Sequence, residues 1–307
     1  MGTARRFLPS MSLLRAFEAA ARLQSFTAAA AELNLTQGAI SRQIRVLEEL
    51  LGSNLFLRER QTVRLTSAGE TYAREIREAL KRISSATLSF RANPKGGTLN
   101  LAILPTFGTR WLTPRLPRFL SANPGITVNL ATRLAPFDFN LEQADAAIHF
   151  GAPDWPGAEL ELLMSETVVP VCSPSLLDAY KFERPGDLLK APLLHLVSRP
   201  DAWEHWFEAQ DALTEPLHGM LFDQLATAAQ AAISGLGIAL LPAFLIEDEL
   251  KRRDLVPAID LPMRSAGQYY LAWPSSRSSY WPLVEFRQWI VRETQEFAST
   301  GDDPLSR

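Results

Sequence analysis

The chain has 307 residues, of which 47 % are hydrophobic and 21 % charged, so it is a folded protein too long for one ordinary core. Cys172 is the only cysteine, which excludes an intrachain disulfide and a cysteine-rich metal site and fits a reducing cytoplasm. No segment approaches the roughly 18 uninterrupted apolar residues of a membrane span, so membrane insertion and secretion are both disfavoured.

The net charge of -3 is divided unevenly along the chain. Residues 1–92 hold 14 lysines and arginines against 8 acidic residues, a net charge of +6, whereas the rest of the chain holds 17 against 26, a net charge of -9. A basic segment suits a polyanion, and an acidic body would be repelled by it.

The first elements along the chain are two short helices. From Ser12, which we expect to be the N-cap, Leu13, Phe17 and Ala20 recur at helical spacing. Ser25 introduces a second, alanine-rich helix over residues 27–33. Small side chains let two helices cross closely, as the tight corner of a helix-turn-helix requires.

A third helix is predicted over residues 37–50, with the hydroxyl of Thr36 as its cap. One face of this helix forms a buried apolar stripe, made of Ile40, Ile44, Leu47 and Leu51. The other faces carry the side chains that reach base edges and phosphates, namely Gln37, Ser41, Arg42 and Arg45. Gly38 allows a close approach of the backbone. For an isolated helix, a solvated polar face would be the simpler interpretation.

The segment LFLRERQTVRLT, which follows, favours a DNA-binding face on this helix over a merely solvated one. Apolar residues alternate there with Arg58, Arg60 and Arg64, a pattern that predicts a short β hairpin or wing. Arginines on a wing beside a recognition helix would lie next to phosphates, so we predict a winged helix-turn-helix.

The stretch SFTAAAAELNLTQGAISRQIRVLEELLGSNLFLRERQTVRLTSAG resembles the signature of LysR-type transcriptional regulators, within them the branch of the glycine-cleavage and β-lactamase regulators. The resemblance is close over residues 10–92 and extends in pattern over the rest. It implies double-stranded promoter DNA as a partner, with Gln37, Ser41 and above all Arg42 as base or phosphate contacts. The full set of expected DNA-binding residues is Ser25, Thr27, Thr36, Gln37, Ser41, Arg42, Arg45, Arg58 and Arg64.

A long helix is expected next, because Ser67 and Glu70 have capping-box spacing. Apolar residues continue along it at alternating spacings of four and three, at Tyr72, Ile76, Ala79, Ile83, Ala86 and Phe90. This narrow seam either packs on its own domain or pairs with a second copy. In the family that the sequence resembles the linker helix dimerises, which favours a homodimer or homotetramer. NPKGG, at residues 93–97, is the clearest linker.

The acidic body alternates strands and helices, which predicts a parallel α/β sheet. Strands are expected over residues 98–104, 125–132, 144–151, 166–174, 237–242 and 268–274. The order resembles the two-lobed fold of periplasmic binding proteins, which is the effector domain of the family. The fold class is therefore α/β overall, with a winged helix-turn-helix over residues 1–66, a linker helix over 67–92 and an effector-binding domain over 93–307. Lobe I would span about 98–168 and 271–300, and lobe II about 169–270, with chain crossings near 167–171 and 268–272.

The cleft between such lobes is the expected site of a small-molecule effector, for example an amino acid, a peptide or a carboxylate. By the resemblance its lining would comprise Thr106, Phe107, Asp138, His149, Asp223, Gln224 and one of Tyr269 and Tyr270. His149 stands where the branch usually has arginine, which questions the usual ligand charge. A histidine at the end of an apolar strand is also commonly structural.

No enzyme motif emerges. The 4 histidines lack metal-site spacing, no HExxH, GxSxG or Walker sequence occurs, and the glycines of SGLGIALLP lack the third glycine of a dinucleotide site. We therefore predict no catalytic activity, no metal and no cofactor. Two functions stay open, a ligand-gated regulator and a ligand-independent architectural DNA-binding protein.

Overall fold

The computed structural model describes residues 8–59, 62–92, 97–212 and 217–299. The chain divides into two compact units, Met1–Pro94 and Lys95–Arg307, and each is described by itself. Most of the predicted linker at 93–97 lies outside the described residues.

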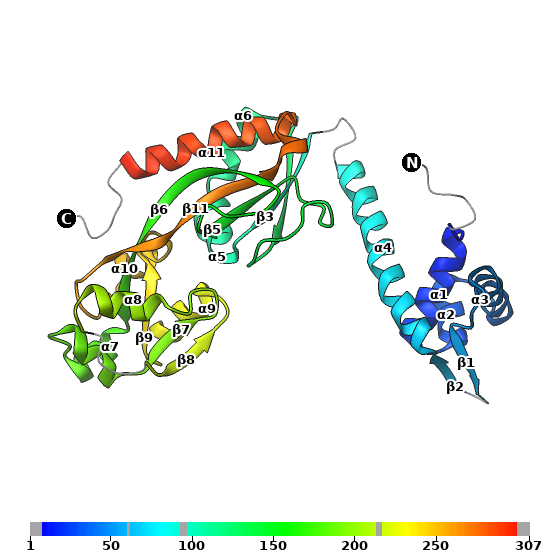
Figure 1. The fold of residues 1–307 in the computed structure, drawn as a ribbon, viewed down its shortest axis with the longest axis horizontal. Helices are drawn as coiled ribbons and strands as arrows, with labels where there is room; N and C mark the ends of the chain where they lie inside the picture. Colours follow the sequence, from blue (N-terminus) through cyan, green and yellow to red (C-terminus); the bar gives the residue numbers. More distant parts are fainter. Residues whose placement is uncertain (1–7, 60–61, 93–96, 213–216, 300–307) are drawn as a thin grey trace. The chain divides into compact units, whose positions relative to one another are not determined.

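The first unit consists of helices and a hairpin (Figure 1). Its elements are α1 (Met11–Leu23), α2 (Phe26–Leu33), α3 (Gln37–Leu51), β1 (Phe56–Glu59), β2 (Thr62–Leu65) and α4 (Ser67–Ala92). Strands β1 and β2 pair antiparallel, with Phe56 opposite Leu65. Three helices, a two-stranded wing and a long helix therefore follow in the order that the sequence predicts.

Phe17 of α1 is the centre of this unit's core. Its ring is fully buried and lies 5.8 Å from that of Phe56 on β1 and 5.4 Å from that of Tyr72 on α4. Ile40, Ile44 and Leu47 complete the core from α3. The apolar side chains of the recognition helix thus face inward, which leaves its polar side chains outside.

Three details of the sequence prediction are wrong. Helix α1 begins at Met11 with Ser10, not Ser12, at the N-cap position. Helix α4 is capped by Thr66 rather than Ser67, because the Gly69 N–H donates to the Thr66 hydroxyl at 3.0 Å. Leu51 does not complete the buried stripe and is 39 % exposed, since α3 ends there and Gly52 turns the chain away.

Gly69 marks a close approach between α4 and the start of the wing. A Cβ atom at this position would lie 2.1 Å from the Leu55 carbonyl oxygen, which is part of the backbone. The backbone oxygen cannot move aside as a flexible side chain can. The first turn of α4 therefore requires glycine for contact with the segment before β1.

In the second unit, the described strands form a nine-stranded sheet in the order β4-β3-β5-β11-β6-β9-β7-β8, with β10 against β6. They are β3 (Thr98–Ile103), β4 (Thr127–Thr132), β5 (Ala146–Gly151), β6 (Ala158–Cys172), β7 (Leu193–Leu196), β8 (Gly219–Phe222), β9 (Ile238–Pro242), β10 (Val256–Pro257) and β11 (Met263–Pro274). Parallel pairing, as the sequence predicts, joins β3 with β4 and β5. Strand β7 also pairs parallel with β8 and β9, although the sequence analysis did not predict strands at β7 and β8. However, β11 pairs antiparallel with β5 and β6, so the sheet is mixed.

Helices cover both ends of this sheet. They are α5 (Pro105–Phe107), the π-helical turn η2 (Gly108–Leu112), α6 (Leu116–Ala122), α7 (Pro174–Tyr180), η3 (Pro185–Lys190), α8 (Ala202–Ala209), α9 (Leu225–Ile233), η4 (Ala243–Leu245), α10 (Glu247–Arg252), η5 (Ser275–Arg277) and α11 (Trp281–Ser299). Between β9 and β10 the chain forms two short helical elements, η4 and α10, which meet at Ile246.

Strands β6 and β11 lie in the middle of the sheet and run from the part that holds β3 and β5 to the part that holds β9 and β7 (Figure 1). Strand β6 pairs with β11 as far as Val168, and then with β9 over Val168–Val171. The register of β11 is irregular between Arg264 and Gln268, just before the segment expected as a crossing. We use lobe I for the part built on β4, β3 and β5, and lobe II for the part built on β9, β7 and β8.

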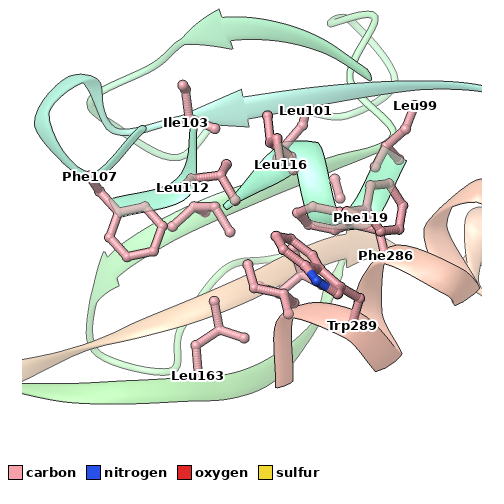
Figure 2. Packing of buried hydrophobic residues seen from close by; sticks show 14 of the residues in the cluster. Leu99, Leu101, Ile103, Phe107, Leu112, Leu116, Phe119, Leu163, Phe286 and Trp289 are labelled. Atoms are coloured by element: carbon pink, nitrogen blue, oxygen red, sulfur yellow. The ribbon is translucent and has the colours of Figure 1, made fainter. Parts of the chain in front are cut away.

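Lobe I contains the largest single cluster of buried apolar residues among those that the structure describes (Figure 2). Every second residue of β3, namely Leu99, Leu101 and Ile103, points toward the helical layer. In that layer, the ring of Phe119 on α6 lies 5.5 Å from that of Phe286 and 5.1 Å from that of Trp289, both on α11. This packing fixes the carboxyl end of β3, and the segment 104–107 that follows it.

Gly69→Ala is expected to lower the free energy of local unfolding of the first unit by about 1–3 kcal/mol, because a new methyl group is forced against the Leu55 carbonyl. Hydrogen exchange of the α1 and β1 amides measures this change. Gly38→Ala is the matched control, since a Cβ there meets nothing within 4 Å. Equal protection in both variants would contradict the close approach.

Candidate functional site

Helix α3 presents a polar surface opposite its buried stripe. Gln37, Arg42 and Arg45 are exposed, and Ser41 is half-buried. The Gln37 amide donates to the Ser41 hydroxyl at 3.1 Å, which aligns two of the predicted contacts on one turn. The guanidinium groups of Arg42 and Arg45 project into solvent with no ion pair among the described residues. This surface offers cations and hydrogen-bonding groups to a partner.

The remaining predicted DNA-binding residues fall into two sets. The hydroxyls of Ser25 and Thr36 each accept a helix-start N–H at 3.2 Å, from Ala28 and Ala39, so both are used for capping. Thr27 and Arg64 are exposed. Arg58 is on β1, but its side chain lies outside the described residues.

Glu48, which the sequence analysis did not single out, connects α3 to the wing. It is only 8 % exposed, and its Oε1 atom accepts the N–H groups of Leu55 at 2.8 Å and Phe56 at 3.1 Å. A buried carboxylate with backbone donors is costly to disturb. The recognition helix and the hairpin are thereby held in one arrangement.

The second unit contains a cavity of about 540 Å³, counting space that is open to solvent. Three of its walls follow the carboxyl ends of parallel strands. Leu104–Phe107 come after β3, Ser198 and Arg199 after β7, and Asp223–Leu225 after β8. Ligands of open α/β sheets bind outside the carboxyl ends of the strands, so this is the expected place for a ligand.

Strand alternation decides which tyrosine lines the cavity. Tyr269 pairs with Phe150 of β5, and both belong to the lining. Tyr270 pairs with His149, and these two face the opposite side of the sheet, since successive side chains of a strand alternate. There the His149 ring lies 5.4 Å from that of Trp155.

Both lobes contribute to the cavity, and one hydrogen bond joins them across it. Thr106 follows β3 of lobe I, is 6 % exposed, and its hydroxyl accepts the N–H of Ala226 at 3.2 Å. Ala226 lies in the first turn of α9, in lobe II, where N–H groups lack helical partners. The length of this hydrogen bond therefore depends on the separation of the two lobes.

A buried ion pair borders the cavity. The carboxylate of Glu166, on β6, binds the Arg199 guanidinium through both oxygens, one of them at 3.2 Å from Nη2, and accepts the Tyr269 hydroxyl at 3.0 Å. The guanidinium also lies 3.9 Å from the centre of the Phe150 ring. Burial raises the pKa of Glu166, against the lowering effect of Arg199, and burial raises the pKa of Tyr269 well above its ordinary value.

Of the residues predicted for the effector site, the cavity brings together Thr106, Phe107, Asp223, Gln224 and Tyr269. Asp138, His149 and Tyr270 are not among its lining residues. Asp138 is exposed in the loop after β4, where its carboxylate accepts the Asn140 N–H at 2.8 Å. The same loop places Leu134 in the lining.

The described residues contain no group of three or more histidine, cysteine, aspartate or glutamate side chains that could hold a metal ion. Within those same ranges, no helix combines the length and the apolar content needed to cross a membrane.

Comparisons with known families match both units. Residues 11–70 match the model described as bacterial regulatory helix-turn-helix protein, lysR family, and residues 92–295 match the LysR substrate binding domain. The chain belongs to the LysR family of transcription regulators. It has the family's DNA-binding helix-turn-helix and its effector-binding domain, as the sequence predicts.

Curated relatives extend this match over nearly the whole length. The chain is 38 % identical to the glycine cleavage system transcriptional activator of Escherichia coli (strain K12), over 92 % of this chain and 93 % of the relative. It is 34 % identical to the transcriptional activator AmpR of Rhodobacter capsulatus, over 93 % and 98 %. The branch predicted from the sequence is thus confirmed, and these relatives are regulators rather than enzymes.

Solved structures agree with the fold. The effector domain of AmpR from Pseudomonas aeruginosa has a TM-score of 0.61 at 29 % identity, and covers 66 % of this chain and 98 % of its own. Full-length CbnR, in complex with its target DNA, has a TM-score of 0.70 at 22 % identity over 93 % of this LysR-family chain and 100 % of its own. At 22 % identity, the similarity to CbnR supports the fold alone.

The sequence held signals for some of the residues that were missed. Arg199 follows LLHL, a short apolar run that the sequence analysis did not predict as a strand, and ligand residues gather after the strands of such a sheet. Glu166 is an acidic residue next to the apolar run TVVPVC, and buried acids of this kind need a partner. Nothing local identifies Glu48, because its partners belong to the chain after the helix.

Burial lowers the pKa of His149 from its ordinary value near 6.5, although its bond to the Ala152 carbonyl opposes this. His149 therefore binds a proton more readily in the unfolded chain than in the folded one. The contribution of neutral His149 to the free energy of unfolding is present above about pH 6.5 and is lost as the pH falls. His149→Gln should lose less stability than the wild type between about pH 7.5 and about 5.5.

Tryptophan fluorescence during denaturant unfolding measures this, because all 7 tryptophans lie in the second unit. His218→Gln, at an exposed position, is the control. An unaltered pH dependence for the His149 variant would contradict the assignment.

Proposed function

We propose that the chain binds promoter DNA as a homodimer or homotetramer and that a small molecule, bound in the cavity of the second unit, alters this binding. The observation that carries the proposal is a cavity lined by both lobes and bridged by the Thr106–Ala226 hydrogen bond. A ligand there would favour one separation of the lobes over another. Because promoter DNA of bacteria lies in the cytoplasm, we expect the protein to act there.

In this proposal α3 enters the major groove. Its exposed Gln37 and Arg42 can form bidentate hydrogen bonds to adenine and guanine, while Arg45 and Arg64 bind phosphates. Gly38, near the helix start, has open space around its Cα, so that the backbone can approach a phosphate. The hydroxyls of Ser25 and Thr36 are used to cap helices. The backbone groups next to these residues, more than the hydroxyls, are therefore available to DNA.

Dimerisation is supported by the second half of α4. Tyr72 and Ile76 pack on the first unit's own core, but farther along Ile83 is 48 % exposed and Phe90 is 68 % exposed. Apolar side chains of this size on a narrow helical seam favour pairing with another helix. Two recognition helices would then bind two half-sites.

The effector proposed here is a small polar molecule with an apolar part, such as an amino acid, a peptide or a carboxylate. The polar lining residues are Thr106, Ser198, Arg199, Asp223 and Gln224, and the apolar part would contact the rings of Phe107, Phe150 and Tyr269. Asp223 and Gln224 come directly before α9, so a ligand there also meets the start of a helix.

Arg42→Ala should weaken promoter binding by about 1–3 kcal/mol and relax specificity at one base position. Gly38→Ala should weaken binding without loss of stability, because its methyl group meets only the partner. Fluorescence anisotropy with promoter DNA at fixed salt measures both. Arg91→Ala, an exposed arginine on α4, is the charge-matched control. Equal losses for Arg42→Ala and Arg91→Ala would show general attraction rather than base contact.

Ser198→Trp should fill the cavity and abolish effector-dependent changes in the footprint upstream of the protein's own gene, while binding to DNA persists. Candidate amino acids, peptides and small carboxylates are added to the wild type first. Ser276→Trp, at an exposed position outside the lining, is the control.

A wild-type footprint that no candidate alters, together with unchanged regulation by the Ser198 variant, would favour the architectural alternative. A Ser198 variant that still responds to an active candidate would place the effector elsewhere.

A further inference from the structure

Glu48 occupies a position on α3 that is unfavourable for a carboxylate. It lies in the last turn of the helix, and this turn, all of which the structure describes, holds no basic side chain. The free carbonyl groups at the C-terminus of a helix repel a negative charge. Glu48 is also only 8 % exposed, so its carboxylate loses most of its hydration. Hydrogen-bond donors must offset both costs, and those that Glu48 meets indicate what it stabilises.

The donors that meet Glu48 belong to the start of the wing. Its Oε1 atom accepts the N–H groups of two successive residues, Leu55 at 2.8 Å and Phe56 at 3.1 Å. On the other side of this backbone, the Leu55 carbonyl accepts the N–H of Thr66 at 2.9 Å, and the Thr66 hydroxyl donates to the Asn54 carbonyl at 2.9 Å. The segment that enters β1 is therefore bonded to α3 through its N–H groups and to the residue after β2 through its carbonyl groups.

The wing depends on this anchoring because its strands are short. Strands β1 and β2 pair over four residues each, and an isolated two-stranded hairpin is only marginally stable in water. The ring of Phe56 is buried against that of Phe17, but a ring contact does not fix the direction in which the backbone leaves the core. Two hydrogen bonds to one carboxylate oxygen are directional. Arg64, which is exposed, pairs with Leu57, the residue directly after Phe56.

We infer that Glu48 is a positioning residue for DNA binding: it holds the wing where Arg64 can contact a phosphate while α3 contacts the bases. This inference rests on the DNA contacts proposed above for α3 and Arg64. Because Glu48 is buried, it acts through the wing and not on the DNA itself. A displaced wing would lose phosphate contacts, which supply affinity and salt dependence, whereas the base contacts of Arg42 would persist and maintain specificity.

The test begins with the direction in which affinity changes. Removing an acidic charge near DNA should by electrostatics alone strengthen binding, whereas the inference predicts that Glu48→Ala weakens it by about three- to tenfold. Glu48→Gln should weaken it less, because its amide oxygen can still accept an N–H. Fluorescence anisotropy of the full chain with promoter DNA, over a series of salt concentrations, measures both variants. The slope of log K against log salt should become less steep by about one, the value of one phosphate contact.

Glu49→Gln is the matched control, since Glu49 is the next residue of α3 and is exposed. It removes the same charge from the same helix turn without affecting the hydrogen bonds to Leu55 and Phe56. This variant should bind DNA as tightly as the wild type, or more tightly, with an unchanged salt slope.

Double variants distinguish a displaced wing from a general loss of structure. In the Arg64→Ala background, Glu48→Ala should weaken binding little further, because the phosphate contact is already absent. In the Arg42→Ala background, the two losses should multiply to within about twofold, as independent effects do. Both Glu48 variants should also keep the wild-type discrimination at the base position that depends on Arg42. An unfolded first unit would lose that discrimination.

Binding by both Glu48 variants that is as tight as that of Glu49→Gln, with an unchanged salt slope, would overturn the inference. So would equal coupling of Glu48 to Arg42 and to Arg64 when Arg64→Ala itself weakens binding, and the proposed contacts would then stand without it. If Arg64→Ala binds DNA like the wild type, the proposed phosphate contact is wrong and the inference fails with it. If circular dichroism shows that Glu48→Ala does not fold, Glu48→Gln is used for the same comparisons.

Discussion

The buried carboxylate of Glu166 requires partners, and its partners bring together separate parts of the second unit. Arg199 arrives from the segment after β7, and Tyr269 from β11. Without these donors, the desolvation free energy of the buried carboxylate would not be offset by any hydrogen bond or ion pair. Satisfying it places an arginine, a tyrosine and the ring of Phe150 at one cavity wall. The polarity of the proposed effector site follows from this requirement.

The two long strands explain why such a wall can form between lobes. Strands β6 and β11 take part in both lobes, and the pairing partner of β6 changes from β11 to β9 at Val168. Next to this change, Glu166 and Tyr269 are joined by their hydrogen bond. A ligand that alters the contacts of Arg199 thus acts close to the chain segments that connect the lobes.

In the first unit, too, a buried carboxylate holds separate segments of the chain together. Glu48 is buried and accepts two backbone N–H groups at the start of the wing, which fixes the hairpin relative to α3. Around it, Phe17, Phe56 and Tyr72 bind α1, the wing and α4 into one core. The polar surface of α3 is consequently presented by a rigid scaffold, as base recognition requires.

The sequence by itself determined the helices of the first unit, the caps at Ser25 and Thr36, the stripe of Ile40, Ile44 and Leu47, and the family, because these depend on local periodicity and on short motifs. It also predicted Thr106 and Asp223 for the cavity wall. Only the tertiary structure decided between Tyr269 and Tyr270, since that choice depends on which face of β11 turns toward the cavity. It alone revealed Glu48 and the pair of Glu166 and Arg199, because their partners are set by folding and not by spacing along the chain.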